Sequence, residues 1–164
     1  MYAIGEHVIH PGQGVCTVID IKLDAPTPMI VLSARSGHNE TRIQYPLSQQ
    51  DKLHPAISPA QAHELLECYD HVETDSFCAR NSALEEAHFR EQMRLGASES
   101  VRVAKTMRER IAVAQHRGKK PSSYYARVLK EAHRRARAEI ACVLDMSEDE
   151  LDNQIDDAVA HAAQ

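Results

Sequence analysis

The spacing of apolar residues changes near Pro55, and this change limits the folds open to the chain more than any other feature. Residues 1–54 contain short runs in which apolar and polar positions alternate, separated by turns rich in Pro and Gly. That pattern is typical of β-strands. Beyond residue 58 the apolar positions recur every three or four residues, the period of an amphipathic α-helix. Because strand and helix patterns are not interleaved, the sequence predicts an α+β protein with two domains, residues 1–54 and 58–164.

The first domain is expected to contain several short strands, at about residues 6–10, 15–23, 29–33 and 41–45. The turn Pro11-Gly12-Gln13-Gly14 separates the first two, because Pro presets φ and Gly supplies a positive φ. Strict alternation would put the odd-numbered residues from Val15 to Leu23 on one side of the second strand. So many short strands in so few residues predict a small, strongly bent antiparallel sheet or barrel.

The second domain carries clear signals for helix ends. Ser58 and Gln61 form a capping box, and Ser147 and Glu150 form another. Gly96 suits the position just after a helix, and Ser98 suits the N-cap of the next one. The expected helices begin near residues 59, 77, 98, 123 and 148, and the fourth carries an apolar face made of Val128, Ala132, Ala136, Ile140 and Val143.

The cationic residues are concentrated in the middle of the chain. Residues 76–137 hold fifteen Lys and Arg against six Asp and Glu, although the whole chain has a formal charge of −5. Arg127, Lys130 and Arg134 fall on one face of the expected fourth helix. A cationic helical segment between acidic ones is typical of a surface that binds a polyanion. A solvated helical face, partly neutralised by acids such as Glu131, explains the same pattern.

Catalytic and metal-binding motifs are not found. The ten histidines include no H-x-x-x-H pair, and the four cysteines include no C-x-x-C pair. We therefore expect no enzyme, no cofactor, no metal site and no small-molecule substrate. The N-terminal residues do not read as a signal peptide, and no apolar run approaches the length of a membrane span. These features favour a reduced, cytoplasmic protein with no membrane partner.

Two parts of the chain resemble the CarD/CdnL family of bacterial transcription regulators. The first is Ile4-Gly5-Glu6-His7-Val8-Ile9-His10-Pro11-Gly12-Gln13-Gly14-Val15, which is similar to the opening of that family. The second comprises Arg80-Asn81 and the stretches 117–123, 126–132 and 139–144, which look like the family's helical domain. Transcription-repair coupling factors also contain the N-terminal module, so it is the order of both halves that makes the resemblance specific.

The resemblance implies a Tudor/SH3-like antiparallel β-barrel that binds the β subunit of RNA polymerase, followed by an all-α helical bundle. The bundle would contact promoter DNA at the upstream edge of the melted bubble, in a holoenzyme that carries the principal sigma factor. The polymerase-binding residues implied here are Lys22, Arg42, Ile43, Gln44 and Tyr45. The charge pattern and the resemblance together select Phe77, Arg80, Arg90, Arg94, Lys119, Lys120, Arg127 and Lys130 as DNA-binding residues.

Phe77 has two readings. Many relatives use a Trp as a wedge in the minor groove, and Phe77 is the nearest replacement in a chain without Trp. Alternatively, Phe77 is a hydrophobic residue that packs onto the start of a helix. For the whole protein we expect a regulator that stabilises the promoter open complex. The alternative is a polymerase-binding adaptor that makes no direct contact with DNA.

Overall fold

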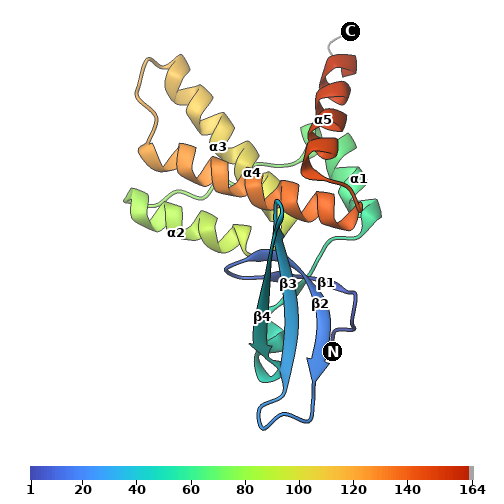
Figure 1. Cartoon of the computed structure of the whole chain (residues 1–164). Helices are drawn as coiled ribbons and strands as arrows, with labels where there is room; N and C mark the ends of the chain where they lie inside the picture. Colours follow the sequence, from blue (N-terminus) through green and yellow to red (C-terminus); the bar gives the residue numbers. More distant parts are fainter. Residues whose placement is uncertain (163–164) are drawn as a thin grey trace. The chain divides into compact units, whose positions relative to one another are not determined.

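The predicted α+β class is confirmed by the computed structural model, which describes the backbone of residues 1–162 and the side chains of residues 1–157. The chain divides into two compact units, Met1–Ala56 and Ile57–Gln164. Figure 1 shows that the strands belong to the first unit and the long helices to the second. Within residues 1–162, no helix is both long and apolar enough to cross a membrane.

The first unit is a five-stranded antiparallel sheet with the strand order β4-β3-β2-β1-β5. Its elements are β1 (His7–His10), β2 (Gly14–Lys22), β3 (Met29–Ser36), β4 (Asn39–Pro46), the 3₁₀-helix η1 (Leu47–Lys52) and β5 (His54–Pro55). The strands β4 and β5 form the two edges of an open sheet, so the barrel closure considered from the sequence is not observed among the described residues. The last strand, β5, has only two residues and pairs with β1.

The core of the β unit contradicts the simple alternation expected for β2. Cys16 and Val18 are buried in it, together with Val8, Ile30, Leu32 and Leu53. The pairing of β2 with β3 shifts between Val18 and Asp20, which marks a β-bulge. An extra residue reverses the in–out phase of the strand, so Ile21 packs against the same core as Val18. The odd-numbered residues of 15–23 therefore do not share one face of the strand.

The second unit is built around one long helix, α4 (Ser123–Val143). The other elements are α1 (Pro59–Glu67), the 3₁₀-helix η2 (Tyr69–His71), α2 (Ser82–Met93), α3 (Ala97–His116) and α5 (Glu148–Ala162). The first half of α4 packs against α2 and α3, with Phe89, Met107, Tyr124 and Val128 in that core. The second half packs against α1 and α5, with Ala62, Ile140 and Leu151 between them. The expected apolar face of α4 is confirmed.

The capping boxes are confirmed, but two helix starts differ from the prediction. Ser58 caps α1 through Gln61, and Ser147 pairs reciprocally with Glu150 at the start of α5. The helix expected from residue 77 begins at Ser82, with Asn81 as its N-cap. The expected N-cap at Ser98 is also wrong, because Gly96 occupies that position with a φ of 126°. An L-residue would be strained there, and a glycine cannot supply a side-chain cap.

Glu139 makes up for the missing cap. Its side chain is only 2% exposed, and its Oε1 accepts a hydrogen bond of 3.0 Å from the backbone N–H of Ile57. Burial raises the pKa of Glu139, and hydrogen bonds from the N–H groups of Ile57 and Ala97 oppose this rise. Because Ala97 is the first residue of α3, one carboxylate of α4 holds both the N-terminus of α3 and the entry to α1.

We expect Glu139→Gln and Glu139→Ala to separate the two roles of this residue. A raised pKa in the folded state means that the stability due to Glu139 is full below its ordinary value of 4.5 and is lost as pH rises through the raised pKa. The free energy of unfolding of Glu139→Gln, measured with urea, should therefore exceed that of the wild type increasingly as pH rises over this range. Glu139→Ala should be less stable than the wild type by about 1–3 kcal/mol at low pH, because buried N–H groups lose their acceptor, and the gap should narrow as pH rises and the wild type loses stability. Parallel pH profiles for wild type and Glu139→Gln would contradict the assignment.

Candidate nucleic-acid interface

The helices α2 and α4 lie side by side and carry several of the predicted DNA-binding residues (Figure 1). Arg90, on α2, donates to Oε1 of Glu86 from Nε at 3.1 Å and from Nη2 at 2.8 Å. Arg127, on α4, donates from Nη2 to Oε2 of Glu86 at 3.2 Å. The two arginines, 37 residues apart in the sequence, thus meet at a single carboxylate. The hydrogen bond from Arg90, followed by that from Arg127, lowers the pKa of Glu86 and keeps it ionised.

Other arginines of this region are also paired. Arg94 contacts Glu91 at 2.6 Å, within α2. Arg134 and Arg135 both donate to Glu131, at 2.7 Å and 2.9 Å. The bond from Arg134 is the largest of the influences that lower the pKa of Glu131 to about 2. At neutral pH much of the positive charge on α2 and α4 is therefore already balanced by acids of the same helices.

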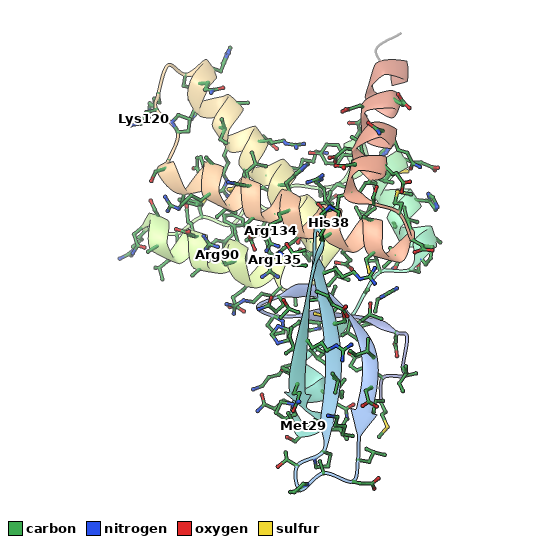
Figure 2. All side chains as sticks on the ribbon, in the orientation of Figure 1. Met29, His38, Arg90, Lys120, Arg134 and Arg135 are labelled. Carbon is green, nitrogen blue, oxygen red and sulfur yellow. The ribbon has the colours of Figure 1, made fainter. Side chains whose placement is uncertain are left out.

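A second group of cations is unpaired. Each is exposed, and none of their side chains forms a hydrogen bond or ion pair with any residue that the structure describes. Its members are Arg80, Arg117, Lys119, Lys120 and Lys130. Figure 2 shows Lys120 at the connection between α3 and α4, at one end of this helix pair. These side chains can reach a phosphate without first breaking an internal contact.

Some cations that the charge count includes are used by the fold instead. The ammonium group of Lys105 donates to the backbone carbonyls of Tyr69, Asp70 and Val72, at 3.2, 2.9 and 2.7 Å. Arg137 binds Asp152 and Glu148 of α5. These contacts hold η2 and α5 in place, so Lys105 and Arg137 are structural residues here.

Phe77 lies outside any helix, in the segment that leads into α2. Its ring stacks on His88, with centroids 3.9 Å apart, and meets Phe89 edge-on at 6.5 Å. Nη2 of Arg110 donates to its carbonyl at 2.5 Å. Asp75 fixes both Phe77 and His88, since its carboxylate lies 2.7 Å from Nε2 of His88 and accepts a hydrogen bond from the N–H of Phe77 at 2.9 Å. The ring is therefore anchored on α2, and Phe77 as a residue remains 37% exposed.

The predicted polymerase-binding residues lie on the sheet, four of them on one edge. Arg42, Ile43, Gln44 and Tyr45 belong to β4. Arg42 and Gln44 are exposed, whereas Ile43 and Tyr45 pack partly on the core. Lys22 is exposed at the end of β2, next to Met29 in the pairing with β3. Because β4 has eight residues and β5 only two, β4 is the edge that can pair with an added strand.

The helical unit also contains a groove of about 600 Å³ between α1, α3, α4 and α5. Ala104 and Ala136 line it, and Arg108 and His133 stand among its polar residues. Burial lowers the pKa of His133, with smaller contributions from Arg108 and Arg137. Among the described residues, no three His, Cys, Asp or Glu side chains come close enough together to hold a metal ion.

Compared with known proteins, the chain matches no family model and no curated protein.

The structure adds two residues that the sequence reasoning did not select. Arg117 is exposed next to Lys119 and Lys120, and its position in the same cationic run is a signal that was readable. Glu86 was not identified as the partner of two arginines. Its i,i+4 spacing from Arg90 was visible in the sequence, but its bond to Arg127 depends on how α2 packs on α4.

Neutralising the two connection lysines tests whether this surface contacts phosphates. We expect Lys119→Gln/Lys120→Gln to weaken binding to a duplex of arbitrary sequence. The slope of log K against log salt should become less steep by about 0.9 for each lysine that contacts a phosphate. The matched control is Lys22→Gln/Lys52→Gln, which removes the same charge from the β unit. Equal slopes for the two double variants, measured by fluorescence anisotropy, would exclude the connection from the interface.

Proposed function

We propose that this protein is a transcription regulator that binds RNA polymerase through its β unit and promoter DNA through its helical unit. The observation that carries the proposal is the set of exposed cations on α2, α4 and the α3–α4 connection. In such an interface, unpaired lysines give affinity for phosphates without reading sequence. A factor bound to polymerase does not need to read the DNA sequence itself, because the polymerase already selects the promoter.

The resemblance to the CarD/CdnL family supplies the partners. By this resemblance, the β unit is a Tudor-like module that docks on the polymerase β subunit in a holoenzyme with the principal sigma factor. The sheet supports this reading, because β1 to β4 form an antiparallel meander and the last strand, β5, returns to pair with β1. The long edge β4, with Arg42 and Gln44 exposed, offers both backbone groups and side chains to a partner.

The proposed mechanism is a shift of the promoter equilibrium. A factor that binds the melted promoter more tightly than the closed one raises the open population by the ratio of the two affinities. Phe77 would contribute an apolar surface at the bubble edge. Its anchoring by His88 and Arg110 suits that role, since a wedge that is already held loses little entropy on binding.

A second candidate is an adaptor that binds polymerase and makes no direct contact with DNA. The ion pairs of Arg90, Arg94 and Arg127 favour it, because arginines that are already neutralised gain less from a phosphate. The two candidates differ in the salt dependence of complex formation on promoter DNA, which would be weak for the adaptor.

Promoter opening tests the main proposal. With a bacterial holoenzyme and a fluorescent base in the bubble, we expect the protein to raise the open fraction. We expect Phe77→Ala to reduce this effect, because the substitution removes the exposed ring. The matched control is Leu84→Ala, which removes an exposed apolar side chain from α2. An unchanged open fraction despite measured polymerase binding would instead favour the adaptor.

Charge reversal on the sheet edge tests the polymerase contact. We expect Arg42→Glu to weaken binding to the polymerase β subunit by about tenfold or more, as is typical when one charge of an interface pair is reversed. The control is Arg35→Glu, since Arg35 is also exposed but belongs to β3, the neighbouring interior strand. Binding is measured by surface plasmon resonance. If both variants lose the same affinity, the effect is general electrostatics and not a contact at β4.

A further inference from the structure

Glu86 occupies a position that a phosphate group could take. Arg90 presents Nε and Nη2 to one carboxylate oxygen, and Arg127 presents Nη2 to the other, at 2.8–3.2 Å. Two guanidinium groups that converge on two anionic oxygens form the same arrangement that binds a phosphodiester. The carboxylate is thus an internal anion in a site built from two helices.

The site is open on its cationic side. The side chains of Arg90 and Arg127 are 43% and 57% exposed, whereas that of Glu86 is 21% exposed. An incoming phosphate can therefore reach the arginines from solvent, whereas Glu86 is less exposed than either. Because both anions need the same donors, they compete for the arginines.

The other acidic partners do not have this arrangement. Glu91 pairs with Arg94 alone, in neighbouring turns of α2. Glu131 pairs with two arginines, but both belong to α4 and the side chain of Arg135 is only 11% exposed. Of these three carboxylates, Glu86 is the one that joins exposed arginines of different helices.

We propose that Arg90 and Arg127 form one phosphate-binding site for nucleic acid, and that Glu86 limits its affinity by occupying the site in the free protein. This inference rests on the proposed DNA contact and deepens it. The carboxylate keeps the two arginines ordered and lowers non-specific affinity, so that binding requires exchange of Glu86 for a backbone phosphate. A factor that must act at promoters, through polymerase, benefits from weak binding elsewhere.

The test compares the full-length wild type with Glu86→Gln and Glu109→Gln, using a short duplex of arbitrary sequence at several salt concentrations. Glu109 is exposed on α3 and has no ion pair with a described residue, so its substitution makes the same change in net charge. Freeing one phosphate contact should steepen the salt slope of Glu86→Gln by about 0.9, which corresponds to about eightfold tighter binding near 0.1 M salt. Glu109→Gln should leave the slope unchanged.

A double-mutant cycle locates the effect. Arg127→Gln should abolish the gain in the Glu86→Gln background and should weaken the wild type much less, because Glu86 already occupies that arginine. Thermal unfolding of each variant controls for loss of fold. If Glu86→Gln fails to fold, the salt slopes of Arg127→Gln and Lys130→Gln are compared in the wild-type background. The inference expects a smaller loss of slope for Arg127→Gln, and equal losses overturn it.

The outcomes are distinct. Weaker or unchanged binding by Glu86→Gln, with wild-type binding measurable, overturns the role of Glu86 and leaves the proposed DNA contact standing. If neither wild type nor Glu86→Gln binds any duplex at low salt, and promoter opening is also unaffected, then the proposed DNA contact itself has failed.

Discussion

The helical unit depends on one buried carboxylate. Glu139 sits in the second half of α4, accepts the N–H of Ile57 and caps the glycine-led start of α3 near Ala97. Burying a charge is costly unless it is hydrogen-bonded, and here the donors are backbone groups that would otherwise be unsatisfied. The same contact fixes where the chain enters the unit and how α3 begins. The contact also ties α3 to α4, the two helices whose connection carries Lys119 and Lys120.

Acidic residues organise the positive charges throughout this unit. Glu86 and Glu131 each hold two arginines, and Asp75 holds the ring of His88 against Phe77. When charges are counted along the sequence, residues 76–137 form a strongly cationic segment. The folded protein divides those cations into residues that stabilise helices and residues that remain open to a partner. The proposed function relies on the cations that remain open to a partner. In the proposed role of Glu86, Arg90 and Arg127 are paired in the free protein and become available when a phosphate replaces the carboxylate.

Local signals predicted part of the fold well, and the failures have identifiable causes. The capping boxes at Ser58 and Ser147 were readable because their partners lie three residues away. The start of α2 was misplaced, because Asp75 and Phe77, in the non-helical segment before it, are bound by Thr106 and Arg110, more than 30 positions along the chain. The phase of β2 was misread, because the bulge after Val18 leaves no signal in the alternation.

The sequence by itself determined the α+β fold class, the change from sheet to helix near Pro55, the capping boxes at Ser58 and Ser147 and the apolar face of α4, since each rests on residues close together along the chain. It also selected the cationic segment. Only the tertiary structure decided which cations are available. The bond between Glu86 and Arg127, the use of Lys105 to hold η2 and the stacking of Phe77 on His88 all join residues from different elements. Such contacts depend on how helices pack, and packing is a property of the whole unit that no local pattern encodes.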